Sequence, residues 1–263
     1  MKKFSVLIVS LVLLASLITV SCMAATTDSP DIKAIKDRGV LKIGVKVDVP
    51  KFGYRDPKTD KIDGFEVDIA KVIAKKILGN KAKVDFQAVN AKTRGPLLDN
   101  GEVDLVIATF TITDERKKSY NFSDPYFTDG VGLLVKKAGK YKSLQDLNGK
   151  KIGVAQSSTS RKAVQDEADK LGIKIDFFEY ATYPEIKAAL DSGRVDCFSV
   201  DASILNGYVD RSTMVLSDRF SPQNYGVASK KGNDGLAQLV NDTINDMKNS
   251  GQINKLIKKW KIK

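Results

Sequence analysis

The chain has 263 residues, of which 42% are hydrophobic and 29% charged, which is enough for one large domain or two smaller lobes with packed cores. The formal net charge is +11, but basic residues alternate with acids. No finger, homeodomain or RNA-binding signature accompanies them, so we expect no nucleic-acid partner. The sequence contains no histidine, which removes the commonest general acid and base of enzymes.

The N-terminal segment has the pattern of an export signal. Residues 1–25, MKKFSVLIVSLVLLASLITVSCMAA, combine a basic start with an apolar run and then small residues. The end of the apolar run, ITVSC, resembles a bacterial lipobox in which Cys22 is lipidated and becomes the mature N-terminus. Ordinary cleavage after Ala24 or Ala25 is the alternative. We therefore expect an exported protein, in the periplasm or on the outer face of the cytoplasmic membrane, with a lipid anchor at Cys22.

The two cysteines are not expected to pair. If Cys22 carries lipid, Cys197 has no partner for a disulfide. Cys197 lies in the apolar run RVDCFSVD, which predicts a small buried side chain.

Strand and helix patterns alternate along the rest of the chain. Strands are predicted at residues 41–47, 82–89, 103–108, 150–155, 173–180, 195–200 and 225–231. Helices are predicted at residues 64–80, 93–101, 156–172, 183–193, 201–209, 234–249 and 252–260, and Ser143 is a predicted N-cap. This alternation predicts an α/β architecture with mostly parallel sheets.

Two segments of similar pattern indicate two lobes. GEVDLVIATFTI, at 101–112, and GRVDCFSVDASI, at 193–204, both place Val-Asp and an apolar strand after a glycine, and both strands end in polar residues. Two α/β lobes that present such residues at strand ends would form a site between them. The alternative is that Val-Asp after glycine is simply common where strands begin.

Several longer segments carry a family resemblance. They are GFEVDIAKVIA at 64–74, TITDERKKSYNFSDPYF at 111–127, LNGKKIGVAQSSTS at 147–160 and ALDSGRVDCFSVD at 189–201. From about Ile32 onward the chain resembles the family 3 extracellular solute-binding proteins of polar amino acid ABC importers. The resemblance implies the type II periplasmic-binding-protein-like fold, in which two α/β lobes are joined by two crossing hinge strands and close over a ligand.

The resemblance also implies lobe boundaries. The first lobe comprises residues 26–125 and 226–263, the hinge segments are 126–130 and 221–225, and the second lobe is 131–220. Gly130 and Pro222 are the expected hinge elements.

The motif TITDER is expected to bind the α groups of an amino acid. The resemblance implies that Arg116 clamps the α-carboxylate, to which a guanidinium presents a planar fork of donors. Thr109 and Thr111 resemble residues that bind the α-ammonium and carboxylate. From the residues alone, Thr113 is an N-cap with acids after it, and Arg116 would lie on the exposed face of a capped helix.

The second lobe is expected to complete the site. Ser158 and Thr159 follow a strand and precede a helix, where backbone N–H groups can bind an anion, although the family usually carries Gly-Thr there. The resemblance implies that Asp201 pairs with the α-ammonium. A helix N-cap is the alternative role for Asp201, and the two roles are compatible.

Three further residues indicate an acidic ligand. Lys46 and Arg94 resemble the aspartate/glutamate-binding branch of the family, in which such cations meet the side-chain carboxylate. A neutral ligand would leave a buried Lys46 or Arg94 unpaired. Tyr183 matches a ligand-contacting tyrosine of the same branch. The alternatives are surface charge for Lys46 and Arg94, and core packing for Tyr183.

The sequence therefore predicts a binding protein that delivers L-aspartate or L-glutamate to an ABC permease through ligand-stabilised lobe closure. We expect a monomer without cofactor, metal or catalytic activity. One alternative is a dehydratase-like enzyme of the same fold, for which Glu66 or Glu179 would supply the acid. A surface adhesin and the sensor part of a signalling system are the others.

Overall fold

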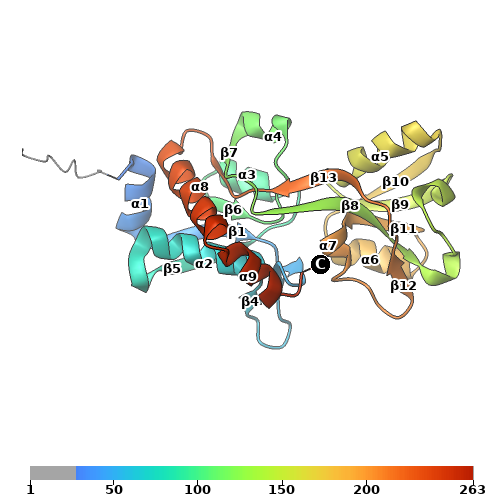
Figure 1. The fold of residues 1–263 in the computed structure, drawn as a ribbon, viewed down its shortest axis with the longest axis horizontal. Coiled ribbons are helices and arrows are strands. Elements are labelled where there is room, and N and C mark those ends of the chain that lie inside the picture. Colours follow the sequence, from blue (N-terminus) through green and yellow to red (C-terminus); the bar gives the residue numbers. More distant parts are fainter. Residues whose placement is uncertain (1–27, 263) are drawn as a thin grey trace, which may run out of the picture.

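The computed structural model describes residues 28–262, which form two mixed sheets covered by helices (Figure 1). Two long strands, β8 (Phe127–Lys136) and β13 (Phe220–Tyr225), pair with each other and run between the two halves (Figure 1). The predicted two-lobe α/β fold is confirmed.

The first lobe is built on a five-stranded sheet. Its order is β5 (Lys83–Ala88), β1 (Val40–Val45), β6 (Leu105–Ile107), β14 (Ala228–Lys230) and β7 (Tyr120–Phe122). Its helices are α1 (Pro30–Arg38), α2 (Phe65–Leu78), α3 (Arg94–Asp99), α4 (Asp114–Ser119), α8 (Asp234–Asn249) and α9 (Gln252–Lys259). Leu41, Ile43 and Val45 of β1 are fully buried, so this central strand anchors the core.

The second lobe contains a six-stranded sheet. The order is β10 (Ile175–Tyr180), β9 (Lys150–Ala155), β11 (Cys197–Asp201), β8 and β12 (Thr213–Val215), and β13 pairs with β8. Its helices are α5 (Ser160–Leu171), α6 (Tyr183–Asp191) and α7 (Ala202–Leu205). Three 3₁₀ turns, Gly79–Lys81, Lys137–Gly139 and Leu144–Leu147, and a small sheet of β2 (Asp48–Val49), β3 (Gly53–Arg55) and β4 (Ile62–Asp63) complete the described elements.

The prediction of mostly parallel sheets is wrong. The strands β5, β1 and β6 are parallel, as are β10, β9 and β11, but β14 and β8 pair antiparallel to their neighbours. The reason is the hinge: β8 leaves it for the second sheet and β14 follows the return crossing into the first. Both strands therefore run against those of the βαβ units.

Local signals for helix ends are confirmed in most places. The Thr113 hydroxyl accepts a hydrogen bond from the Arg116 N–H at 3.1 Å and caps α4. Ser143 takes part in a capping box. Gly172 ends α5 in the left-handed region, at φ 65°. The helix predicted at 201–209 is shorter than expected, because α7 ends at Leu205.

The paired crossing strands are irregular on the β13 side. Asp129 faces Gln223 and Thr128 faces Asn224, but the register shifts between Phe220 and Pro222. Ser221, between those two, has φ 45°, a conformation that a residue with a Cβ rarely adopts. The lobe boundaries at residues 126–130 and 221–225 stay a prediction, as does hinge motion.

The remaining expectations concern single features. Cys197 is fully buried, as predicted, and forms no disulfide within residues 28–262. Cys22 and the leader lie outside the described residues. Between residues 28 and 262, the helices are too short or too polar to cross a membrane.

Candidate functional site

The two lobes contact each other at the ends of their central strands. Arg116 of the first lobe donates through Nη2 to the Ser157 carbonyl of the second lobe at 3.1 Å. The Tyr208 hydroxyl donates to the Asp48 carbonyl, and the Tyr183 N–H lies 3.5 Å from Asp48 Oδ2. The residues between these contacts lie on two facing surfaces, the first-lobe wall and the second-lobe wall.

Arg116 crosses the boundary between the lobes. Its Nη1 donates to the Thr111 carbonyl at 2.7 Å, and its guanidinium lies 4.7 Å from the centre of the Phe110 ring. Burial, together with the neighbouring Arg94, lowers the pKa of Arg116 to about 9, which leaves it charged at neutral pH. The capped helix exists, but the alternative that Arg116 lies on its exposed face is wrong.

Arg94 lies next to Arg116 and is 3% exposed. Its Nη1 donates to the carbonyls of Ala108 and Thr109 at 2.7 and 3.1 Å, and its guanidinium lies 4.1 Å from the Phe110 ring centre. The Nε donor is buried without a hydrogen-bond partner. The Phe110 ring thus contacts both guanidinium groups, and Arg94 has one N–H donor that forms no hydrogen bond.

Lys46 follows β1 directly and is 1% exposed. Its ammonium lies 3.1 Å from Asp48 Oδ1 and 4.2 Å from the centre of the Tyr183 ring. Burial lowers the pKa of Lys46, and the charge of Asp48 opposes that shift. The alternative of surface charge is therefore wrong for both Lys46 and Arg94.

A buried carboxylate holds the loop after β6. Thr109 has φ 45°, and its N–H donates to Glu66 Oε1 at 2.6 Å. The same oxygen accepts from the Tyr126 hydroxyl at 2.5 Å. Burial raises the pKa of Glu66 to about 7. Glu66 thus ties α2, the strained Thr109 and the start of the crossing strands together.

Asp201 ends β11 with its carboxylate buried. The Tyr225 hydroxyl donates to Oδ2, and burial raises the pKa of Asp201 to about 7. The carboxylate makes no capping hydrogen bond to α7, although Asp201 occupies the N-cap position. The capping alternative is wrong, and the role in ligand binding stays a prediction.

The polar residues Thr111, Ser158 and Thr159 are engaged differently from expectation. The hydroxyls of Thr111 and Thr159 both donate to Gln223 Oε1, at 2.8 and 2.7 Å. The Ser158 N–H donates to the Ala155 carbonyl at 3.2 Å, so this amide, expected to bind an anion, is used within the turn.

Buried polar atoms without hydrogen-bond partners concentrate around these residues. Five of the seven found between residues 28 and 262 belong to Asp48, Glu66, Arg94, Thr109 and Ser158. Such atoms are rare in folded proteins, because buried polar groups are nearly always hydrogen-bonded. Eight of the nine predicted binding residues belong to one group of contacts where the lobes meet, and Ser158 adjoins that group as the chain neighbour of Thr159.

Sequence reasoning missed Asp48 and Gln223, and weighed Glu66 only as a catalytic acid. The signal for Asp48 was its spacing from Lys46, since i and i+2 share a face of an extended segment. Gln223 follows a proline in a polar run and has no comparable signal. In the part of the chain that the structure describes, no group of histidine, cysteine and carboxylate side chains suits a metal ion.

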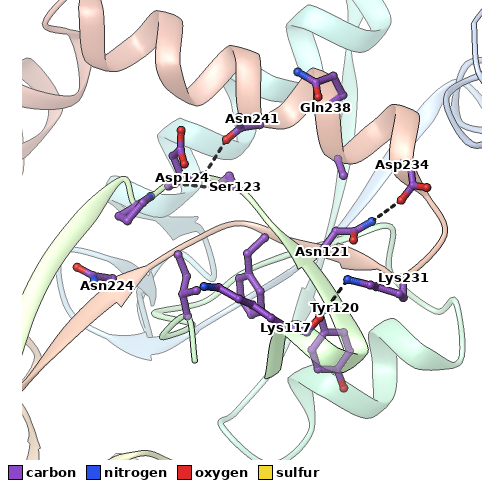
Figure 2. A pocket seen from close by; sticks show the side chains of 14 residues that line it. Lys117, Tyr120, Asn121, Ser123, Asp124, Asn224, Lys231, Asp234, Gln238 and Asn241 are labelled. Carbon is purple, nitrogen blue, oxygen red and sulfur yellow. Dashed lines mark hydrogen bonds between the residues drawn. The ribbon is translucent and has the colours of Figure 1, made fainter. Parts of the chain in front are cut away.

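A separate cavity of about 670 Å³ lies on the surface of the first lobe, between β7 and α8 (Figure 2). Its polar groups largely pair with each other: Asn121 donates to Asp234 at 3.0 Å, and Asn241 accepts from the Asp124 N–H at 2.7 Å (Figure 2). None of the nine predicted binding residues lines it.

Comparison with known proteins settles the family. Residues 41–263 match the bacterial extracellular solute-binding proteins, family 3. The chain belongs to this family. It is 41% identical over 230 residues to the ABC transporter glutamine-binding protein GlnH of Bacillus subtilis, with 86% of this chain and 83% of that protein covered.

Two further relatives are named for other amino acids. The L-glutamate/L-aspartate-binding protein of Pseudomonas aeruginosa is 28% identical over 264 residues, which cover 93% of this chain and 87% of that protein. The structure of an ancestral arginine-binding protein bound to arginine is 39% identical, with a TM-score of 0.76 and coverage of 85% of this chain and 98% of that one. The chain is thus an amino-acid-binding protein of an ABC importer.

Proposed function

We propose that the protein binds L-aspartate or L-glutamate between its lobes and delivers it to an ABC permease. Arg116 holds the α-carboxylate and Asp201 the α-ammonium. Lys46 and Arg94 hold the distal carboxylate, while Thr109, Ser158 and Tyr183 line the space between them. Thr111 and Thr159 support the site through Gln223.

The observation that carries the acidic ligand is a pair of buried cations, of which Arg94 has an unused donor. Arg94 Nε has no hydrogen-bond partner, and the Lys46 ammonium forms an ion pair with Asp48 Oδ1 at 3.1 Å, which leaves its other N–H donors for a ligand. A carboxylate between Lys46 and Arg94 would satisfy both. Charge-assisted hydrogen bonds of this kind contribute about 1.5–3 kcal/mol each.

L-Glutamine is the second candidate, and one observation favours it. Asp48 compensates the charge of Lys46 inside the site, so a neutral side chain does not leave that lysine unpaired. The Bacillus subtilis relative is named for glutamine. A terminal amide could accept from Lys46 or Arg94 and donate to Asp48.

Calorimetric titration with L-aspartate, L-glutamate, L-glutamine, L-arginine and L-histidine separates the two candidates. We expect the acidic amino acids to bind at least tenfold more tightly than glutamine. Glutamine that binds more tightly than both acids would transfer the proposal to the second candidate. Micromolar or tighter binding of arginine would contradict both.

We further propose that the mature protein is a lipid-anchored monomer that closes on its ligand. Mass spectrometry of the mature protein tests the anchor, because an acylated Cys22 carries the added lipid mass and blocks N-terminal sequencing. Light scattering tests the oligomeric state. Incubation with each amino acid, followed by product analysis, tests the dehydratase alternative, in which any turnover would contradict a purely binding role.

A further inference from the structure

We infer that Gln223 is a latch that stabilises the closed form by holding Thr159 of the second lobe against the crossing strand β13. The inference rests on the proposed function in one respect, namely that the protein closes on an amino acid. It does not depend on which amino acid binds.

The contacts of Gln223 join three parts of the molecule. Its Oε1 accepts from Thr111 Oγ1 of the first lobe at 2.8 Å and from Thr159 Oγ1 of the second lobe at 2.7 Å. Its Nε2 donates to the Ser221 carbonyl at 2.9 Å. Gln223 is 1% exposed, so these bonds are shielded from competing water.

The orientation of the Gln223 amide follows from its partners. A carbonyl oxygen can only accept, so the NH₂ group must face the Ser221 carbonyl. The amide oxygen then faces the two threonines and uses both of its lone pairs on their hydroxyls. Neither hydroxyl can be replaced by a methyl group without a loss at this oxygen.

The backbone around Gln223 shows which bond must break when the lobes separate. The Ile112 N–H donates to the Asn224 carbonyl at 2.8 Å, and the Gly226 N–H donates to the Phe110 carbonyl at 3.1 Å. The end of β13 is therefore fastened to the first lobe, and Gln223 stays with Thr111. Thr159 lies at the start of α5 in the second lobe, so opening separates it from Gln223.

The irregular part of β13 lies just before this latch. Ser221, with φ 45°, falls at the register shift, and its carbonyl accepts from the Gln223 amide. Gln223 therefore also fixes the conformation of the bend through which the crossing strand would flex. The same Gln223 side chain therefore bonds to Thr159 in the closed form and to Ser221 in the bend of β13.

Paired substitutions at Thr159 test the latch. Thr159→Val removes the hydroxyl and keeps the shape, whereas Thr159→Ser keeps the hydroxyl. The loss of one neutral hydrogen bond is expected to weaken binding by about two- to tenfold in Thr159→Val, with Thr159→Ser close to wild type. The weakening should appear as faster dissociation in stopped-flow measurements, because the latch forms only after closure.

Substitution of the Gln223 side chain provides a second test of the latch. Gln223→Met should weaken binding at least as much as Thr159→Val, and the double variant should be no weaker than Gln223→Met alone. Asn224→Ala is the matched control, because the Asn224 side chain accepts from Thr128 within the crossing strands. Thermal unfolding checks that every variant is folded.

The outcomes separate the latch from the choice of ligand. Each titration uses L-aspartate and L-glutamine, and preference of the wild type for glutamine would overturn the acidic ligand and leave the latch intact. Spin labels on cysteines at the exposed positions Lys92 and Lys162 report the distance between lobes without any ligand. Unchanged dissociation and unchanged distances in both Thr159→Val and Gln223→Met would overturn the latch.

Discussion

The two walls of the closed site differ in charge and in support. The first-lobe wall carries three cations, Lys46, Arg94 and Arg116, of which the first two are almost completely buried. Asp48 pairs with Lys46 there, so the wall keeps an excess of positive charge. The second-lobe wall carries one carboxylate, Asp201, and a short polar turn. From this difference we expect the first lobe to recognise carboxylates before closure, and the second lobe mainly to complete the site and stabilise the closed form.

The largest expected effect tests the first wall. Arg116→Ala should weaken the binding of every amino acid by at least about 100-fold, because two charge-assisted hydrogen bonds to the shared α-carboxylate are lost. Calorimetry with L-aspartate and L-glutamine measures this loss. Lys118→Ala, an exposed substitution on the same helix, is the control. Retained affinity in Arg116→Ala would show that the cationic wall does not hold the α-carboxylate.

A selective effect is expected at the far end of the same wall. The double substitution Lys46→Met and Asp48→Asn removes the ion pair without leaving one buried charge. Binding of L-aspartate should fall by about 10- to 100-fold, and binding of L-glutamine should change by less than about threefold. Lys92→Met is the exposed control. Equal losses for both ligands would contradict a role in selecting the distal group.

The raised pKa of Asp201 predicts that ligand affinity depends on pH. Burial raises its pKa to about 7, while the Tyr225 hydroxyl, Arg94 and Arg116 oppose the shift and Asp129 adds to it. A ligand ammonium favours the ionised form, so binding must release a proton below pH 7. Affinity should therefore fall as the pH is lowered from 7 to 5, by at most about tenfold per pH unit.

The ligand itself keeps its charge between pH 7 and 5, because its distal carboxylate ionises near pH 4. Glu66 has a similarly raised pKa, so the series is repeated in Glu66→Gln. Affinity that is independent of pH between 5 and 7 in both proteins would show that Asp201 is already ionised without ligand.

The smallest expected effect concerns Tyr183, a residue of the second lobe whose ring contacts Lys46 of the first lobe. Its ring lies 4.2 Å from the Lys46 ammonium and 6.0 Å, centre to centre, from Phe198. Tyr183→Phe keeps the ring and should change affinity by less than about threefold, while Tyr183→Leu should lower it several-fold. A large loss in Tyr183→Phe would instead assign the contact to the hydroxyl.

Sequence patterns predicted the local elements better than the long-range pairing. The Thr113 cap and the Gly172 helix end depend on a few neighbouring residues, and both are where the sequence places them. The antiparallel pairing of β8 with β11 and of β14 with β6 joins segments far apart in the chain, which no local pattern encodes. This is why the mostly parallel sheets were a wrong prediction.

The site shows the same difference between local features, which the sequence predicts, and contacts between distant residues, which it does not. Burial of Lys46 follows from its place after an apolar strand, but its pairing with Asp48 changes the charge balance that favoured an acidic ligand. The hydroxyls of Thr111 and Thr159 have the right chemistry for a ligand, yet Gln223 accepts both. Such choices between partners depend on tertiary geometry rather than on residue type.

The fully buried Cys197 has a practical consequence for measuring lobe motion. Burial raises the pKa of its thiol far above the usual range, so thiol-directed dyes should not react with it while the protein is folded. A cysteine introduced at an exposed position beside the boundary between the lobes would then be the selective labelling site in residues 28–262. An environment-sensitive fluorophore at that position would turn the protein into an optical biosensor for its own ligand.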